Sequence, residues 1–170
     1  MEIKEIESHI SKVPDYPKPG ILFYDISTLI FNKDAFSSSI KKLTDKVKDY
    51  EFDLIASIDA RGFLFGSALA YSLGKGLVMV RKKNKLPGKT ISYDYELEYG
   101  IDTLEINIEA KGKKFLLVDD LLATGGTANA ALELIKKAGG DTSCFLSLIE
   151  LTFLNGRKKI QVPMESLIQY

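Results

Sequence analysis

Two segments near the N-terminus have apolar residues at helical spacing. The first predicts a helix that Pro14 and Pro17 stop, with apolar positions at Ile3, Ile6, Ile10 and Val13. The second predicts a helix capped by Asn32 or Asp34, with a stripe formed by Phe36, Ile40, Leu43, Val47 and Tyr50. Between them we expect a loop at residues 14–20. Residues 21–31 mix apolar and polar side chains, which fits either a strand or an irregular lid over a site.

The next part of the chain alternates short apolar runs with helical segments. The runs predict strands at residues 53–58, 77–80, 115–118 and 143–149, and the helices are expected at residues 62–73 and 126–138. Strands that alternate with helices favour a parallel sheet covered on both faces. The expected fold class is therefore α/β.

Residues 82–111 interrupt this alternation. The segment is long, charged and aromatic, and Leu104, Ile106 and Ile108 alternate with polar neighbours. Period-two alternation is typical of a strand, so we predict a hairpin or a mobile flap. No linker or internal repeat divides the chain, and we expect one domain over residues 1–170, with the flap at 82–110.

Composition and cysteine usage fit a protein of the reducing cytoplasm. The chain has 170 residues, of which 45% are hydrophobic, so a core can form without disulfide bonds. Cys144 is the only cysteine and lies in an apolar run, which indicates an inert core thiol. Residues 1–12 are charged throughout, unlike a signal peptide. No uncharged run reaches the ~20 apolar residues of a membrane span, so we expect a soluble protein without a membrane partner.

The charges balance overall but are segregated locally. There are 23 basic and 23 acidic residues, which argues against nucleic acid as a partner. Six acids and no base occupy residues 94–109, just after a purely basic cluster of Lys75, Arg81, Lys82, Lys83, Lys85 and Lys89. Such clusters are often only solvated faces. This basic one follows a predicted strand, as a polyanion site would.

Residues 118–127 carry the most specific chemical signal. Asp119 and Asp120 follow a predicted strand, and a glycine-rich turn then leads into a helix through Ala123, Thr124, Gly125, Gly126 and Thr127. Paired glycines let several backbone N–H groups point at one anion, and the helix dipole favours a phosphate there. The carboxylates would repel that phosphate, so they must face sugar hydroxyls or a divalent cation. A phosphorylated sugar would satisfy both the acid pair and the glycine-rich turn. The segment is not a Walker loop, because the Gly-Lys-Ser/Thr of that motif is absent.

This strand, acid pair and Thr-Gly-Gly-Thr loop resembles the signature of the type I phosphoribosyltransferases. Four further stretches, together with Glu150-Leu151-Thr152 and Gly156-Arg157, resemble the adenine-specific members of that family: residues 19–23, 59–66, 81–88 and 97–100. The likeness covers nearly the whole chain. It implies the type I phosphoribosyltransferase fold, with a mainly parallel sheet, an N-terminal base-binding hood within residues 1–33 and a flexible hairpin flap.

The resemblance also implies an activity. Such enzymes transfer the 5-phosphoribosyl group from 5-phosphoribosyl pyrophosphate (PRPP) to adenine with Mg²⁺, giving AMP and pyrophosphate in purine salvage. Residues 123–127 would hold the 5-phosphate, and Asp119 and Asp120 the ribose hydroxyls. A homodimer is expected by likeness alone.

Pyrophosphate would be held by the loop 59–62 and by the basic segment. The residues implied are Asp59, Ala60, Arg61, Gly62, Arg81, Lys82 and Lys85. The family often has a cis-like peptide in this loop. Mg²⁺ should bind through oxygens of the donor and water, with no direct protein ligand expected, because it retains its hydration.

The resemblance assigns base recognition and catalysis to other segments. Glu98, in the flap, matches the acid/base that would take a proton from adenine. Adenine would lie between Leu22 and Phe23 on one side and Leu151 on the other. Tyr24 is a departure, because the family usually has an arginine at this position.

Two other functions remain open from the sequence. One is transfer to a different purine base, such as hypoxanthine or xanthine, although such relatives differ in the lid and flap. The other is a regulator that binds PRPP without catalysis. Regulators of this kind usually carry a DNA-binding domain, and the first 50 or so residues contain no evident recognition helix.

Overall fold

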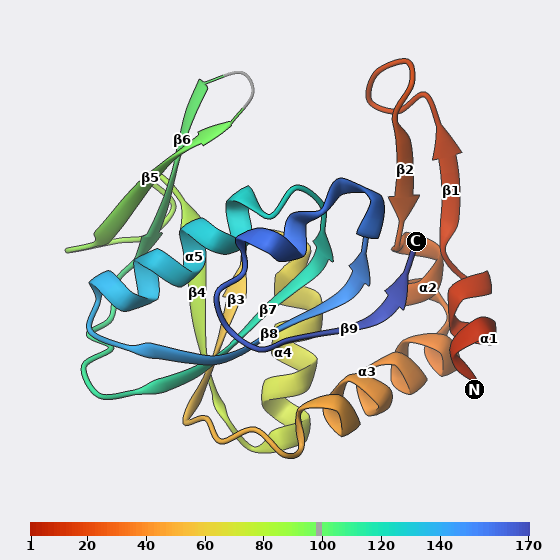
Figure 1. Cartoon of the computed structure of the whole chain (residues 1–170). Helices are drawn as coiled ribbons and strands as arrows, with labels where there is room; N and C mark the ends of the chain where they lie inside the picture. Colours follow the sequence, from red (N-terminus) through yellow and green to blue (C-terminus); the bar gives the residue numbers. More distant parts are fainter. Residues whose placement is uncertain (98–99) are drawn as a thin grey trace. The chain divides into compact units, whose positions relative to one another are not determined.

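The computed structural model describes residues 1–97 and 100–170 (Figure 1). Its helices are α1 (Ile3–Ser8), α2 (Ser27–Phe31), α3 (Lys33–Val47), α4 (Gly62–Leu73), α5 (Gly126–Lys137) and the 3-10 turns η1 (Thr152–Leu154) and η2 (Gly156–Lys159). Its strands are β1 (Ser11–Pro14), β2 (Leu22–Asp25), β3 (Leu54–Ile58), β4 (Gly76–Lys82), β5 (Ile91–Leu97), β6 (Gly100–Ile106), β7 (Lys114–Leu122), β8 (Asp141–Glu150) and β9 (Met164–Gln169). The chain forms two compact units, Met1–Lys42 and Leu43–Tyr170.

The larger unit contains a seven-stranded sheet in the order β5-β6-β4-β3-β7-β8-β9. The five strands from β4 to β9 in this order run parallel, and β6 and β5 continue the sheet antiparallel. This arrangement confirms the expected α/β class with a mainly parallel sheet.

Helices α4 and α5 cover opposite faces of this sheet (Figure 1). In β3, Ala56 and Ile58 belong to the hydrophobic core that includes the buried side of α5. Ser57 points to the other face, because side chains alternate along a strand. There α4 packs so closely that a Cβ on Gly66 would lie 2.4 Å from the Ser57 hydroxyl. Both faces are therefore covered, as the alternating pattern predicted.

The segment that interrupts the alternation forms the hairpin of β5 and β6. Its register pairs Tyr93 with Leu104 and Tyr95 with Asp102. Leu104 and Ile106 are buried, as their alternation predicted, but Glu105 between them is also buried and accepts a hydrogen bond of 3.0 Å from the Asn84 N–H. The hairpin is confirmed, and its mobility stays a prediction.

The smaller unit corrects the prediction for the first helix. α1 ends at Ser8, and the predicted helical position Val13 lies in β1, which pairs antiparallel with β2. This pairing gives residues 11–14 backbone partners on β2, and it leaves Val13 38% exposed where a helical stripe would have buried it. Residues 21–31, left open between strand and lid, form β2 followed by α2.

The start of α3 is capped as the sequence suggested. The side-chain carbonyl of Asn32 accepts hydrogen bonds from the N–H groups of Asp34 and Ala35, at 3.1 and 3.0 Å. These bonds satisfy two of the donors that a helix start leaves unpaired. Of the two candidates, Asn32 is therefore the cap.

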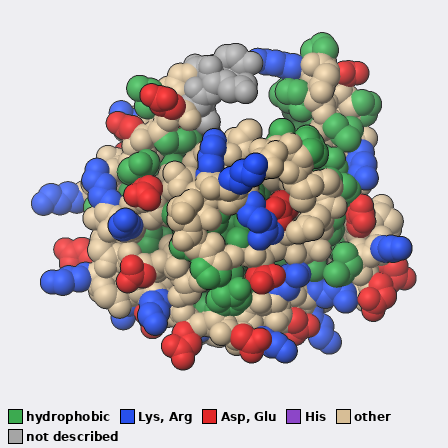
Figure 2. Space-filling model, viewed as in Figure 1, with side chains coloured by type: hydrophobic (Ala, Val, Ile, Leu, Met, Phe, Trp, Pro, Cys, Tyr) green, Lys and Arg blue, Asp and Glu red, His purple; other side chains and the backbone are tan. Residues whose placement is uncertain are grey.

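The structure also bears on the expectations for the cysteine, the charged side chains and membrane spans. Cys144 is a free thiol fully buried in β8, and burial raises its pKa to about 11, as expected for an inert core cysteine. Basic and acidic side chains are interspersed over the face seen in Figure 2. Within residues 1–97 and 100–170, none of the helices has the length and apolar character needed to cross a bilayer.

Candidate active site

A cavity of about 300 Å³ lies at the carboxyl ends of the central parallel strands. It is lined by residues 58–61 at the end of β3, Lys82 at the end of β4, residues 119–128 from the middle of β7 onward, and Tyr95 and Asp102 from the hairpin. Parallel α/β sheets bind ligands at this edge. The cavity thus brings together four segments that are distant in sequence.

The acid pair lies inside β7, which is longer than predicted. The strand continues to Leu122 because it stays paired with β8 as far as Leu122 and Glu150. Its pairing with β3 stops at Val118. From Asp119 onward one edge of β7 is therefore released from β3, and this edge borders the cavity.

The glycine-rich turn after β7 forms the start of α5, as predicted. Gly125 has φ +80°, a left-handed conformation that favours glycine, and it is the residue immediately before the helix. All five residues from Ala123 to Thr127 line the cavity. Their position at a helix N-terminus gives the turn the backbone donors and the positive dipole end that suit a phosphate.

Burial controls the charge state of the two carboxylates. Desolvation and the neighbouring charge of Asp120 raise the pKa of Asp119 well above its usual value. Desolvation also raises the pKa of Asp120, and Arg61 opposes this effect, with its Nε 2.8 Å from Asp120 Oδ2. The Asp120 N–H donates a hydrogen bond of 2.8 Å to Asp119 Oδ1. The pair is therefore poised to gain hydroxyl or cation partners.

The loop after β3 approaches the acid pair from the side. Its Asp59–Ala60 peptide is cis, the feature that the resemblance suggested for this position. Gly62 begins α4, and a Cβ there would lie 2.9 Å from Asp119 Oδ1. Only a glycine leaves room for this close approach. Asp59, Ala60 and Arg61 line the cavity.

The basic segment is only partly directed at the cavity. Of Arg81, Lys82 and Lys85, only Lys82 is among the described residues that line it. Arg81 donates two hydrogen bonds, one of 3.1 Å from Nε to Asp59 Oδ2 and one of 3.3 Å from Nη1 to the Lys85 carbonyl. Arg81 thus links β4 to the 59–62 loop and to the segment after β4.

Lys82 is held by Asp102 of the hairpin, which Tyr95 supports, and the sequence did not single out either as a site residue. Its Nζ donates 3.1 Å to Asp102 Oδ2, and the Tyr95 hydroxyl donates 3.3 Å to the same oxygen. Tyr95 also lies 3.5 Å from the Thr127 hydroxyl. A hairpin register in which Leu97 pairs with Gly100 places Tyr95 opposite Asp102. The sequence could therefore have predicted this contact, had that register been assumed.

The residues expected to bind adenine lie in different units. In the smaller unit, Leu22 is exposed, Phe23 packs edge-on against the Tyr16 ring at 5.0 Å, and Tyr24 is buried. In the larger unit, Leu151 is buried and donates 2.9 Å from its N–H to the Leu122 carbonyl. The expected acid/base, Glu98, lies outside the described residues.

The sheet order and the loop at the end of β7 define an α/β protein of the phosphoribosyltransferase class. Residues 30–159 match the family model of the phosphoribosyl transferase domain. An adenine phosphoribosyltransferase of Rhodospirillum centenum is 51% identical over 168 residues, covering 98% of each chain. The chain therefore belongs to the adenine phosphoribosyltransferase family.

Solved structures agree with this assignment. An adenine phosphoribosyltransferase from Thermoanaerobacter pseudethanolicus matches with a TM-score of 0.96 at 48% identity, covering 99% of this chain and 100% of that one. The enzyme from Saccharomyces cerevisiae, in complex with an imino-altritol bisphosphate and adenine, matches with a TM-score of 0.91 at 37% identity, covering 97% of both chains.

Proposed function

We propose that this chain is a purine salvage enzyme that transfers the 5-phosphoribosyl group from PRPP to adenine, giving AMP and pyrophosphate. One observation carries the proposal: the acid pair, the start of α5 and the Asp59–Arg61 loop line a single cavity. A phosphorylated ribose with a pyrophosphate on C1 needs these three kinds of group together. The adenine-specific relatives, similar over nearly the full length, support adenine as the acceptor.

In this proposal residues 123–127 bind the 5-phosphate. Backbone N–H groups at the start of α5 and the hydroxyls of Thr124 and Thr127 supply its donors. Asp119 and Asp120 accept hydrogen bonds from the ribose hydroxyls. These contacts fix the sugar, so that its C1 lies toward the basic side of the cavity.

Pyrophosphate is the leaving group, and its departure leaves positive charge on the ribose. Arg61, Lys82 and the loop from Asp59 to Gly62 stabilise the charge of pyrophosphate. Arg81 donates a hydrogen bond to Asp59 and so positions this loop. It also donates to the backbone carbonyl of Lys85. Exclusion of water by the flap would protect the sugar from hydrolysis.

Mg²⁺ fits the same cavity, because carboxylate, phosphate and hydroxyl oxygens are the ligands that it prefers. The donor and water would supply its ligands, while Asp119 and Asp120 would hold the ribose hydroxyls beside it. When bound, the ion neutralises charge on the pyrophosphate. Arg61 and Lys82 complete that neutralisation from the protein.

For adenine we retain Leu22, Phe23, Tyr24 and Leu151 as the binding residues. Apolar side chains stack on a purine, and the main chain of Leu22 can read its amino edge. Glu98 would accept the proton that adenine loses on attack. These roles rest on the family resemblance.

We further propose that the chain works as one catalytic domain, in the cytoplasm and as a homodimer. α4 is apolar nearly all round, and Leu64 and the 93% exposed Tyr71 leave part of it uncovered. Leu77 and Met79 of β4 are also exposed. An uncovered apolar surface of this kind suits a second copy of the chain.

The test is a comparison of purine bases. Purified protein, PRPP and Mg²⁺ are incubated with adenine, hypoxanthine, xanthine or guanine, and the nucleotides are separated by chromatography. We expect AMP from adenine and little product from the other bases. Product from hypoxanthine or xanthine alone would support a different base specificity. PRPP binding without any nucleotide product would support the regulator.

A further inference from the structure

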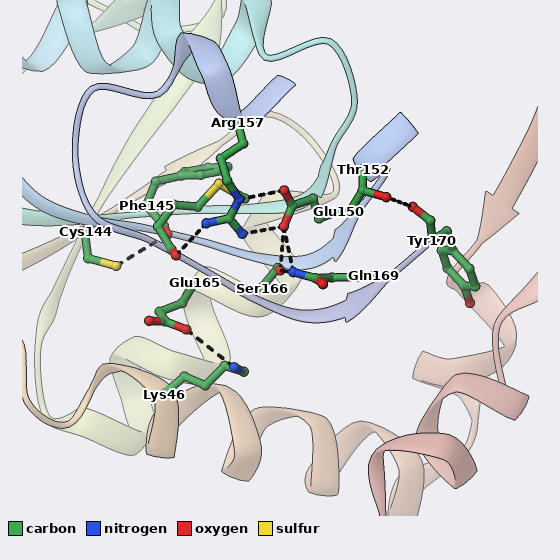
Figure 3. Close-up of polar contacts among 11 residues, drawn as sticks. Lys46, Cys144, Phe145, Glu150, Thr152, Arg157, Glu165, Ser166, Gln169 and Tyr170 are labelled. Atoms are coloured by element: carbon green, nitrogen blue, oxygen red, sulfur yellow. Dashed lines mark hydrogen bonds and ion pairs between the residues drawn. The ribbon is translucent and has the colours of Figure 1, made fainter. Parts of the chain in front are cut away.

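An ion pair between a buried carboxylate and a half-exposed guanidinium lies next to the turn proposed to bind phosphate. Arg157, in η2, directs its guanidinium at Glu150, the last residue of β8 (Figure 3). Nε donates 2.8 Å to Oε1, and Nη2 donates to Oε2. Two parallel bonds between a fork and a carboxylate fix both position and orientation. Only 4% of the Glu150 side chain is exposed.

The remaining bonds of this pair leave little freedom for either partner. Ser166 and Gln169 of β9 donate to Glu150 Oε2 at 2.8 and 3.1 Å (Figure 3). Arg157 Nη1 donates 3.1 Å to the Met164 carbonyl. Hydrogen bonds from Arg157 and Ser166 lower the pKa of Glu150, so the carboxylate stays ionised. Hydrogen bonds from Arg157 therefore link η2 to both β8 and β9.

The residue before Arg157 packs directly on the turn proposed to bind phosphate. A Cβ on Gly156 would lie 2.2 Å from the Ala123 carbonyl and 2.9 Å from the Gly125 nitrogen. A Cβ on Gly125 would in turn lie 2.5 Å from the Gly156 carbonyl. The two backbones are thus in contact with no side chain between them, and a shift of Gly156 must move the turn.

A second connection reaches the other end of the same turn. Glu150 is paired in register with Leu122, the last residue of β7, and the next N–H, that of Leu151, donates 2.9 Å to the Leu122 carbonyl. Glu150 thus lies at the strand position that leads into the turn, while Arg157 holds the segment packed on its middle. The ion pair supports residues 123–125 from both sides.

Arg157 does not attract the phosphate by its charge. Glu150 neutralises it, and among residues 1–97 and 100–170 Arg157 is not part of the cavity lining. We infer that Arg157, acting through Glu150 and Gly156, is a positioning residue for the turn that binds the 5-phosphate. This inference rests on the proposed function, because it concerns the phosphate of that substrate.

The test compares two ligands that differ only in the phosphate. AMP and adenosine are titrated into wild type, Arg157→Ala, Arg157→Lys and the control Lys158→Ala, with calorimetry below the melting temperature of each. Lys158 is the exposed neighbour in η2, and Arg157→Lys keeps the charge but loses the fork. Because Arg157→Lys keeps a cation beside Glu150, it can be used for the test if Arg157→Ala does not fold.

A displacement of ~1 Å in a group that positions the substrate can cost an enzyme ~100-fold in rate. We therefore expect Arg157→Ala to weaken AMP binding roughly tenfold, with adenosine binding changed less than about twofold. Arg157→Lys should lie between wild type and Arg157→Ala, and Lys158→Ala should match wild type. Equal loss for both ligands, or unchanged AMP binding, would overturn the positioning role. Wild type that binds AMP no tighter than adenosine would instead overturn the proposed function.

Discussion

The Nε of Arg61 lies 2.8 Å from Oδ2 of Asp120, so the loop after β3 and the end of β7 meet through opposite charges. Asp120 is 5% exposed, whereas Arg61 lines the cavity and over a third of its side chain is exposed to solvent. Arg61 can therefore pair with Asp120 and still present donors to an anion. This geometry joins the proposed ribose and pyrophosphate sites.

Replacing Arg61 by alanine should weaken pyrophosphate binding. A hydrogen bond to a charged group is worth about 1.5–3 kcal/mol, which corresponds to roughly 10–150-fold in affinity. Calorimetric titration with magnesium pyrophosphate measures the effect, and Lys89→Ala, an exposed lysine outside the cavity lining, is the control. Arg61→Ala with wild-type affinity would remove Arg61 from the pyrophosphate site.

Asp119→Asn should stabilise the ligand-free protein at neutral pH. The pKa of Asp119 is raised in the folded state, so the folded chain keeps a proton that the unfolded chain releases above about pH 3.9. The free energy of unfolding therefore falls as pH rises from the unfolded pKa to the folded one. The asparagine side chain of the variant does not titrate, so this penalty would disappear.

The check is a melting curve for each protein at about pH 4 and about pH 7.5, with 1 kcal/mol worth about 2–4 °C. The advantage of Asp119→Asn over wild type should be larger at the higher pH. Asp45→Asn, on the exposed side of α3, is the control. An advantage that does not grow with pH would contradict the raised pKa.

Much of the fold followed from patterns that are local in sequence. The residues predicted for α4 are those observed, because Gly62 and Gly74 bound a mainly apolar segment. β7 was predicted four residues short at its C-terminal end, since Asp119 and Asp120 interrupt its apolar run while pairing with β8 continues. Val13 was assigned to a helix because its pairing with β2 is not visible in spacing alone.

The candidate site followed from the sequence only where a motif is contiguous. The turn from Ala123 to Thr127 and the loop at Arg61 were found in this way. Asp102 was missed, because its contact with Lys82 depends on hairpin register. The Glu150–Arg157 pair belonged to a matching motif but had no role until the packing of Gly156 was visible.

Asp102→Asn should strengthen pyrophosphate binding at low salt. The hydrogen bond to Asp102 raises the pKa of Lys82 and holds its ammonium, so an anion must compete for it. Exposed ion pairs are worth about 0.2–1 kcal/mol, which predicts a gain of roughly 1.5–5-fold. Titrations at low and high salt should show the gain shrinking as screening rises. Weaker binding by Asp102→Asn would show that Asp102 supports Lys82 instead.

Gly66→Ala should destabilise the larger unit. The added Cβ would lie 2.4 Å from the Ser57 hydroxyl, between α4 and β3, and overpacking of this kind costs about 1–3 kcal/mol. Thermal melting measures the loss, and Ser67→Ala, exposed on the same helix, is the control. The double variant Gly66→Ala with Ser57→Gly should recover much of the loss. A single variant as stable as wild type would contradict the close packing of α4.

The transfer reaction itself is the central claim. Radiolabelled adenine is incubated with PRPP, Mg²⁺ and wild-type protein, and AMP and pyrophosphate are measured in the same samples over time. The account predicts that labelled AMP and pyrophosphate appear together in equal amounts, and only when PRPP is present. Pyrophosphate released without labelled AMP, or no conversion of adenine at all, would contradict it.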